Sequence, residues 1–180
     1  GSVRHAGSRS AGGSGYDTVD YSSQGVIDHI QITMDGAGGF TGVMMDAVSA
    51  PIETDTATSI ERVIGTSGDD IFTSDVTDTD FIGGAGDDTF VASGGDNEIT
   101  GDSGSDTLDY SGSASAISVN MNTLVFGRYL VTNGGDTDSV VGTENLIGTA
   151  FNDTITTDAN AELIQTGAGN DYVDSRASNA

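Results

Sequence analysis

The chain has 180 residues and an acidic composition: 28 Asp and Glu residues against five Arg and no Lys, for a formal net charge of −23. So few basic side chains argue against nucleic acid or an anionic membrane as a partner, because both are bound mainly through Lys and Arg. No apolar run approaches the roughly 20 residues of a membrane-spanning helix. The absence of Cys excludes disulfides and thiolate zinc sites.

Residues 1–11 carry no repeat and are expected to be a tag or linker. The first ordered pattern is Gly12-Gly13-Ser14-Gly15-Tyr16-Asp17-Thr18-Val19-Asp20, a glycine-rich acidic hexapeptide followed by a polar-apolar-polar triplet. It fits the nonapeptide G-G-x-G-x-D-x-U-x, in which U is a large apolar residue. The glycines permit positive φ and a tight turn with inward carbonyls, and the triplet has the alternation of a short strand.

Residues 21–55 interrupt this pattern. They contain alternating apolar residues, Ile30, Ile32 and Met34, which indicate a half-buried strand. Glycines at 36–39 predict a hairpin turn after that strand. We therefore expect a β-hairpin-like excursion from the repeat.

Six nonapeptides follow one another without a gap over residues 56–109. The clearest copy is Gly83-Gly84-Ala85-Gly86-Asp87-Asp88-Thr89-Phe90-Val91. The eighth side chain of each copy should lie on the inner face of a strand while its neighbours point outward. Two nonapeptides would then form one coil of a flattened parallel β-helix.

A second interruption, residues 110–138, is a copy of the first. Asp106-Thr107-Leu108-Asp109-Tyr110-Ser111 precedes it, as Asp17-Thr18-Val19-Asp20-Tyr21-Ser22 precedes residues 21–55. It also begins with an alternating strand, Ile117, Val119 and Met121, and Gly127 marks the expected turn. The chain is thus a duplicated module, and the interruptions either extend the sheet or form a surface for a ligand or partner.

The repeat resumes over residues 139–174, and 175–180 form a tail. The eighth position is apolar in all copies of the repeat, namely Val19, Val63, Phe72, Phe81, Phe90, Ile99, Leu108, Leu146, Ile155, Ile164 and Val173. The sixth position is mostly acidic: Asp17, Glu61, Asp70, Thr79, Asp88, Asn97, Asp106, Glu144, Asp153, Glu162 and Asp171. This regular spacing predicts a single repeat domain over residues 12–174.

These nonapeptides resemble the calcium-binding repeats of the RTX (hemolysin-type) family of type I-secreted bacterial proteins, and the resemblance covers 12–20, 56–109 and 139–174. It implies an all-β fold, a parallel β-roll or right-handed solenoid, here with two inserted β-hairpin-like excursions. It also implies a secreted, extracellular or cell-surface location. In the family each ion lies between loops two repeats apart, held by sixth-position carboxylates and glycine-loop carbonyls.

On that resemblance the metal ligands are the sixth-position aspartates of the glycine-rich loops, Asp17, Asp70, Asp88, Asp106, Asp153 and Asp171. Loop carbonyls would come from near Gly12, Gly65, Gly68, Gly83, Gly84, Gly86, Gly101, Gly104, Gly148, Gly167 and Gly169. If both interruptions leave the roll and rejoin it at the next repeat, all six aspartates share one edge. We therefore predict one row of up to five Ca²⁺ ions. The other edge, with Glu61, Thr79 and Asn97, should be largely free of metal.

Because the acidic chain repels itself in a compact state, calcium is expected to be a condition of folding. The predicted function is a structural or spacer module of a larger secreted or cell-surface protein, such as an adhesin, surface-layer protein or exoenzyme, with neighbouring domains as partners. The alternative is a calcium-dependent recognition module that binds a glycan, a surface or another copy of itself through the interruptions. Catalysis is not expected. The sequence has no G-x-S-x-G or H-E-x-x-H motif, and His29 is isolated.

Overall fold

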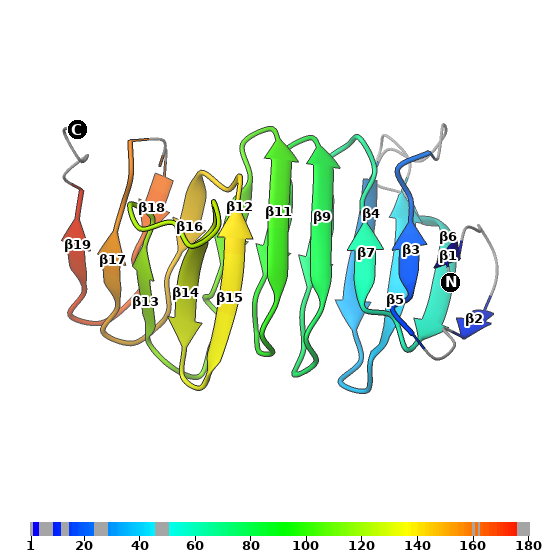
Figure 1. The fold of residues 1–180 in the computed structure, drawn as a ribbon, viewed down its shortest axis with the longest axis horizontal. Coiled ribbons are helices and arrows are strands. Elements are labelled where there is room, and N and C mark those ends of the chain that lie inside the picture. The colour runs from blue at the N-terminus through cyan, green and yellow to red at the C-terminus, as the bar shows by residue number, and fades with distance from the viewer. Residues whose placement is uncertain are drawn as a thin grey trace.

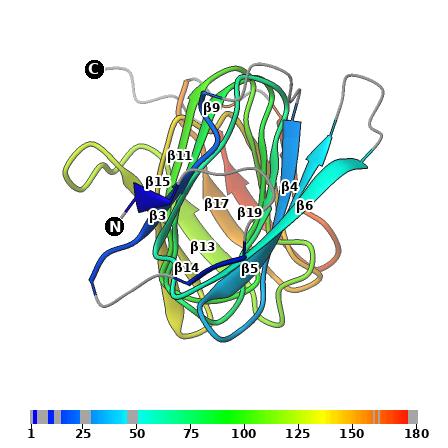
Figure 2. The ribbon, with the colours of Figure 1, turned by 90° about the vertical axis from the view of Figure 1, so that its right-hand side faces the viewer.

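A computed structural model describes residues 2–3, 9–11, 15–23, 29–45, 51–159, 161 and 163–175. This part of the chain contains strands, turns and irregular connections and no helix, so the all-β prediction is confirmed. The strands lie side by side along the long axis, with the two termini at opposite ends (Figure 1). Seen along that axis they form two facing layers (Figure 2).

The described strands form two mixed sheets. The ten-stranded sheet has the order β1 (Ser2–Val3), β3 (Thr18–Asp20), β7 (Arg62–Ile64), β9 (Asp80–Ala85), β11 (Glu98–Ser103), β15 (Asp136–Val141), β14 (Tyr129–Asn133), β13 (Ile117–Asn120), β17 (Thr154–Thr156) and β19 (Tyr172–Asp174). The nine-stranded sheet has the order β18 (Leu163–Gln165), β16 (Asn145–Ile147), β12 (Thr107–Asp109), β10 (Thr89–Val91), β8 (Ile71–Thr73), β4 (His29–Met34), β5 (Gly39–Met45), β6 (Pro51–Thr58) and β2 (Arg9–Ala11).

Strands of the repeat pair in parallel with a register of two nonapeptides. Phe90 pairs with Phe72 on one side and with Leu108 on the other, each eighteen residues away. In the other sheet Ile99 pairs in the same way with Phe81. Successive nonapeptides therefore alternate between the sheets, and every second one is a neighbour in space.

The core lies between the sheets and consists mainly of the eighth-position side chains. Phe72, Phe81 and Phe90 are each 1% exposed. The Phe72 and Phe90 rings stack with their centroids 5.1 Å apart. Burial weakens at the carboxyl end of the ladder, where Ile164 is half-buried and Val173 is 41% exposed. The apolar column predicted from the nine-residue spacing is therefore present, and its largest side chains are the phenylalanines.

Each interruption forms an antiparallel three-stranded unit: β4, β5 and β6 in the nine-stranded sheet, and β13, β14 and β15 in the ten-stranded sheet. In each unit the third strand pairs in parallel with a preceding strand of its sheet, β6 with β2 and β15 with β11. The first strand pairs in parallel with a following one, β4 with β8 and β13 with β17. The expected hairpins are present, and each has a third strand that returns the chain to the sheet.

Because successive nonapeptides alternate between the two sheets, each three-stranded unit takes the place of one nonapeptide in that alternation. The chain enters the unit from the opposite sheet and leaves it for that same sheet, so β3 and β7 are neighbours, and so are β12 and β16. Two edges result. The Asp88 edge carries the loops that lead from the ten-stranded to the nine-stranded sheet, and the Asn97 edge carries the loops that lead back.

Candidate metal centres

Three glycine-rich loops are stacked on the Asp88 edge: 65–70, 83–88 and 101–106. They connect β7 to β8, β9 to β10 and β11 to β12 along the upper edge in Figure 1. The loops turn through backbone conformations that only glycine adopts readily, since Gly84 has a φ of 117° and Gly86 a φ of 113°. Successive loops therefore lie closely against one another, and their sixth-position side chains are aligned.

The sixth-position carboxylates form a ladder of hydrogen bonds along this edge. The amide of Asp70 donates to Asp88 Oδ1 at 2.8 Å, and the amide of Asp88 donates to Asp106 Oδ1 at 2.9 Å. The ladder continues to Glu144, whose Oε2 accepts from the amide of Asp106 at 3.0 Å. Asp70, Asp88 and Asp106 are each 0% exposed. One oxygen of Asp88 and one oxygen of Asp106 thus accept a hydrogen bond from the backbone of the preceding loop.

The second carboxylate oxygens of Asp88 and Asp106 are buried and have no hydrogen-bond partner among the described residues. An unpaired buried charge is costly, so the protonated form is favoured when no cation is bound. Burial raises the pKa of Asp88 to about 8 and that of Asp106 to about 6. A buried carboxylate oxygen without a protein partner is what we expect of a metal ligand in the absence of its cation.

Backbone carbonyls converge on the same two oxygens. A Cβ added at Gly83 would lie 2.8 Å from the carboxyl carbon of Asp88 and 3.0 Å from the carbonyl oxygen of Gly101. A Cβ added at Gly101 would likewise meet the Asp106 carboxylate and the carbonyl oxygen of Gly142. Carboxylate and carbonyl oxygens are the hard donors that Ca²⁺ prefers. The residues present therefore fit calcium.

Asp70 differs from Asp88 and Asp106 because protein donors satisfy both of its oxygens. Its Oδ2 accepts from the amide of Thr66 at 2.6 Å, and its Oδ1 accepts from the amide of Ile30 at 2.7 Å. Thr66 replaces the second-position glycine, and its amide lies close enough to bond the carboxylate. Burial still raises the pKa of Asp70, to about 6.

Asp153 repeats this pattern after the second interruption. The amide of Thr149 donates to its Oδ2 at 2.7 Å, and the amide of Ile117 donates to its Oδ1 at 2.9 Å. Asp153 and Asp171 form a second short ladder, in which the amide of Asp153 donates to Asp171 Oδ1 at 2.9 Å. A Cβ added at Gly148 would lie 2.6 Å from both Asp153 Oδ2 and the carbonyl oxygen of Thr166. The duplicated module therefore repeats its loop chemistry as well as its strands.

The predicted single row of six aspartates is wrong. Asp17, Asp153 and Asp171 lie on the Asn97 edge, opposite Asp70, Asp88 and Asp106. The amide of Asp17 donates to Glu61 Oε2 at 2.7 Å, and Asp106 is followed by Glu144 instead of Asp153. The cause is the step that each three-stranded unit takes in the alternation between sheets, which the prediction did not count. Of the predicted pairs, only Asp70 with Asp88, Asp88 with Asp106, and Asp153 with Asp171 are neighbours.

The predicted loop glycines lie mostly where the loops touch. Gly83 and Gly101 present carbonyls to the preceding loop, whereas the carbonyl of Gly86 lies against Gly104 of the following loop. A Cβ at the other predicted glycines would meet a carbonyl or carboxylate oxygen of a stacked loop: Gly65, Gly84, Gly86 (facing Gly68), Gly148, Gly167 and Gly169. Gly12 lies outside the described residues, as does Glu162. The ligand roles themselves stay predictions.

Two buried side chains on the Asn97 edge have roles that were not predicted from the sequence, the carboxylate of Asp138 and the amide of Asn97. Asp138 accepts at its Oδ1 from the amide of Asn97 at 2.9 Å and at its Oδ2 from the hydroxyl of Tyr110. Burial raises the pKa of Asp138, and these hydrogen bonds partly oppose the shift. Asp138 and Val140 stand at the sixth and eighth positions of a nonapeptide at 133–141, a signal that the assignment of 110–138 to an interruption concealed.

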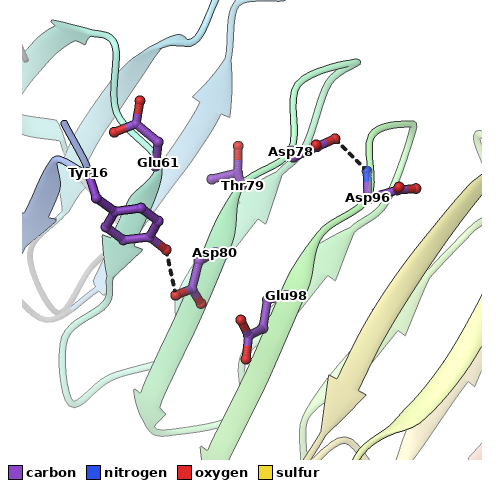
Figure 3. A pocket seen from close by; sticks show the side chains of 7 residues that line it. All are labelled: Tyr16, Glu61, Asp78, Thr79, Asp80, Asp96 and Glu98. Carbon is purple, nitrogen blue, oxygen red and sulfur yellow. Dashed lines mark hydrogen bonds between the residues drawn. The ribbon is translucent and has the colours of Figure 1, made fainter. Parts of the chain in front are cut away.

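A pocket of about 280 Å³ also opens beside the Asn97 edge, lined by Tyr16, Glu61, Asp78, Thr79, Asp80, Asp96 and Glu98 (Figure 3). Tyr16 donates to Asp80 Oδ2 at 3.1 Å, and the guanidinium of Arg62 pairs with the same carboxylate and lies 5.2 Å from the centre of the Tyr16 ring. No group of three or more His, Cys, Asp or Glu side chains among the described residues is arranged to hold a metal by itself. Any calcium site here must therefore include backbone carbonyls.

Comparison with protein families agrees with this loop chemistry. A model of the RTX calcium-binding nonapeptide repeat matches the chain in four copies, at residues 80–113 and 138–173. Over these residues the chain belongs to the RTX calcium-binding nonapeptide repeat family. The predicted family is confirmed, and it implies Ca²⁺ binding. The matched segments contain Asp88, Asp106, Asp153 and Asp171.

RTX repeats are typically structural modules without enzymatic activity, and the proteins that carry them are typically secreted by bacteria. Within the described part of the chain, no helix has the length and hydropathy needed to cross a membrane. A comparison with curated proteins gave no match.

Proposed function

We propose that this chain is a calcium-dependent structural module, a parallel β-roll that folds outside the cell and spaces or supports neighbouring domains of a larger secreted or cell-surface protein. The observation that carries the proposal is the pair of buried, unpartnered oxygens of Asp88 and Asp106, each beside a carbonyl of the next loop. The parallel eighteen-residue register supports the β-roll, because it stacks every second loop on one edge.

This geometry supports two strong calcium sites, at Asp88 and at Asp106. Weaker sites lie beside Asp70 and Asp153, because the amides of Thr66 and Thr149 already satisfy the oxygens that would face the ion. This count replaces the row of five, since Asp17 and Asp70 are not neighbours, nor are Asp106 and Asp153. When bound, calcium supplies the positive charge that lets the buried carboxylates ionise together.

Folding is then linked to the calcium concentration. Extracellular calcium modules commonly bind at roughly 10⁻⁴ to 10⁻³ M. Such affinities leave a protein without its metal in a cytosol and load it outside. A chain that gains its structure only after export suits type I secretion and a role in an adhesin, surface-layer protein or exoenzyme.

Isothermal titration calorimetry, combined with circular dichroism over a calcium titration, tests the proposal. We expect about two ions to bind with the higher affinity and a β spectrum to develop over the same calcium range. A β spectrum that is unchanged by excess EDTA would show that calcium is not a condition of folding. An absence of heat at millimolar calcium would contradict the metal sites themselves.

A recognition module is the second candidate, and one contrast between the duplicated units favours it. The connection between β13 and β14, residues 121–128, projects from the sheets (Figure 2). It exposes Leu124, Val125 and Phe126, and Phe126 is 101% exposed with a φ of 54°. The equivalent turn of the first unit, 35–38, is short and polar. The fold therefore does not require an apolar tip, which suits contact with a glycan or with another copy.

Light scattering at saturating calcium, read beside a glycan array, tests this second candidate. Growth of the wild-type particles that is lost in Phe126→Ser would support self-association through the tip. Val76→Ser is the matched control, because Val76 is 76% exposed in a different loop. Equal behaviour of all three chains in both assays would remove the tip as a recognition site.

A further inference from the structure

Asn97 occupies the sixth position of loop 92–97, in the middle of the row on the Asn97 edge. Its Oδ1 accepts from the amide of Thr79 at 3.2 Å, the same ladder bond that Asp88 Oδ1 accepts from the amide of Asp70. Asn97 is 2% exposed, so its side-chain amide must find partners within the protein. The two loops thus differ in the second atom of the side chain, an NH₂ group in one and an unpartnered oxygen in the other.

The Asn97 NH₂ group lies among three oxygen acceptors. Nδ2 donates to the carbonyls of Gly94 at 2.9 Å and Gly95 at 3.3 Å, and to Asp138 Oδ1 at 2.9 Å. The orientation of the amide is fixed by its surroundings: the Thr79 amide requires an oxygen, and the three acceptors require a donor. A carboxylate and two loop carbonyls around one centre are the same ligand types as those of the proposed calcium sites on the Asp88 edge.

Loop 92–97 also has the glycine turn of a metal loop. Gly95 has a φ of 76°, and a Cβ at that position would lie 2.6 Å from the carbonyl oxygen of Thr77 in the stacked loop. Asp138 completes the set, because it is 2% exposed and its second oxygen is bonded to the Tyr110 hydroxyl. The loop is therefore shaped for a cation, while its sixth residue is a hydrogen-bond donor.

We propose that the side-chain amide of Asn97 takes the place of a calcium ion in loop 92–97, so that the choice of Asn or Asp at the sixth position decides whether a glycine-rich loop binds metal. This inference rests on the proposed calcium-dependent function and deepens it. It makes Asn97 a specificity-determining residue: its two N–H donors bond the oxygens that a bound ion would otherwise neutralise.

Three chains test the inference by calorimetric calcium stoichiometry and by thermal melts at saturating calcium. Asn97→Asp should bind one more calcium ion per chain than the wild type, because two carboxylates would then face the Gly94 and Gly95 carbonyls. Asn97→Ala should bind the wild-type number of ions but melt about 5 °C lower, because it leaves those acceptors without a donor. An unchanged calcium number in Asn97→Asp, or an unchanged melting temperature in Asn97→Ala, would overturn the inference.

The reciprocal exchange covers the case in which Asn97→Asp does not fold. Asp88→Asn and Asp88→Ala should each lose one ion, but Asp88→Asn should melt higher at saturating calcium because its amide can bond the loop carbonyls. Equal melting temperatures for these two variants would overturn the inference. The wild-type titration distinguishes a failure of this inference from a failure of the proposed function. A wild type that binds no calcium contradicts the proposed function, whereas one that binds calcium beside an unchanged Asn97→Asp contradicts only the role of Asn97.

Discussion

Loops 83–88 and 92–97 are consecutive in the chain, and their following strands, β10 and β11, contain equally buried eighth positions, Phe90 and Ile99. Both loops turn through glycines at positive φ and expose an Asp at the fifth position. They differ at the sixth position, where one has a carboxylate with an unpartnered oxygen and the other an amide with three acceptors. The backbone of both loops thus creates an oxygen-lined space, and we propose that the sixth side chain determines whether a cation or a side-chain amide occupies it.

Calcium removal should have the largest effect, and it should act directly on loop 83–88 but not on loop 92–97. Excess EDTA at pH 8 leaves the Asp88 and Asp106 charges buried without a counter-charge, so we expect the β spectrum to be lost at 25 °C. In our proposal loop 92–97 binds no metal, so it should unfold only because it shares the core. Circular dichroism measures the transition, and readdition of calcium should restore the spectrum. A cooperative melt in EDTA with the same Tm as in saturating calcium would contradict the idea that loop 83–88 needs metal and loop 92–97 does not.

Asp106→Asn should cost the stabilisation that one ion provides. At a free calcium concentration about a hundred times Kd, one site contributes about 2.7 kcal/mol, which corresponds to about 5–10 °C in Tm for a chain of this length. Thermal melts at saturating calcium measure the loss. The matched control is Asp87→Asn, since Asp87 is exposed and its Oδ1 only accepts from the amide of Ser105. Asn152 already performs that bond elsewhere, with the amide of Asn170. Equal losses in the two variants would mean that bulk charge, and not a bound ion, explains the effect.

The pH dependence should have opposite signs with and without calcium. Burial raises the pKa of Asp88 to about 8, above the ordinary value of 3.8, so the folded metal-free chain binds more protons than the unfolded chain. The contribution of Asp88 to the stability of that state is therefore greatest below about pH 4 and falls as pH rises towards 8. Calcium requires the ionised form, so the apparent Kd at Asp88 should rise roughly tenfold for each pH unit below 8. Calorimetry at pH 8.5, 7.5 and 6.5 measures this, and a pH-independent Kd would contradict a protonated resting state.

Tyr110→Phe should have the smallest effect of the four. It removes the hydroxyl that donates to Asp138, whose other oxygen stays bonded to Asn97, so we expect a loss of about 1 kcal/mol. The calcium stoichiometry should not change, because neither residue belongs to a proposed metal loop. Urea melts at saturating calcium measure the loss. Tyr21→Phe is the matched control in the first unit, where the Tyr21 hydroxyl bonds Asp55 at 3.3 Å. A change in calcium number on Tyr110→Phe would place Asp138 in a metal site.

Much of the fold could be predicted from the sequence because the repeat couples local and long-range order. The glycine-rich hexapeptide fixes the turn, and the apolar eighth position fixes the inner face, so the strands containing Phe72, Phe90 and Leu108 and their register follow from one period. The two interruptions could be recognised as copies, and their hairpin turns could be placed from glycines. These features depend on residues close together in the sequence.

The grouping of the aspartates could not be predicted, because it depends on pairing between distant strands. The pairing of β6 with β2 and of β15 with β11 determines that each unit counts as one step, and no local pattern around Asp17 or Asp153 contains that information. The hydrogen-bond partners of the individual carboxylates could not be predicted from the sequence either. The threonine at 66 was visible as a departure from the repeat, but its bond to Asp70 depends on how the loop turns.

The single step taken by each three-stranded unit has a consequence for longer arrays of this module. Every copy of the unit transfers the next glycine-rich stack to the opposite rim, as Asp88 and Asp153 illustrate. An even number of units would leave the first and last stacks on the same rim, and an odd number would leave them on opposite rims. Whether the number of units is even or odd would therefore determine whether the calcium charge at the two ends of a long array lies on the same rim or on opposite rims.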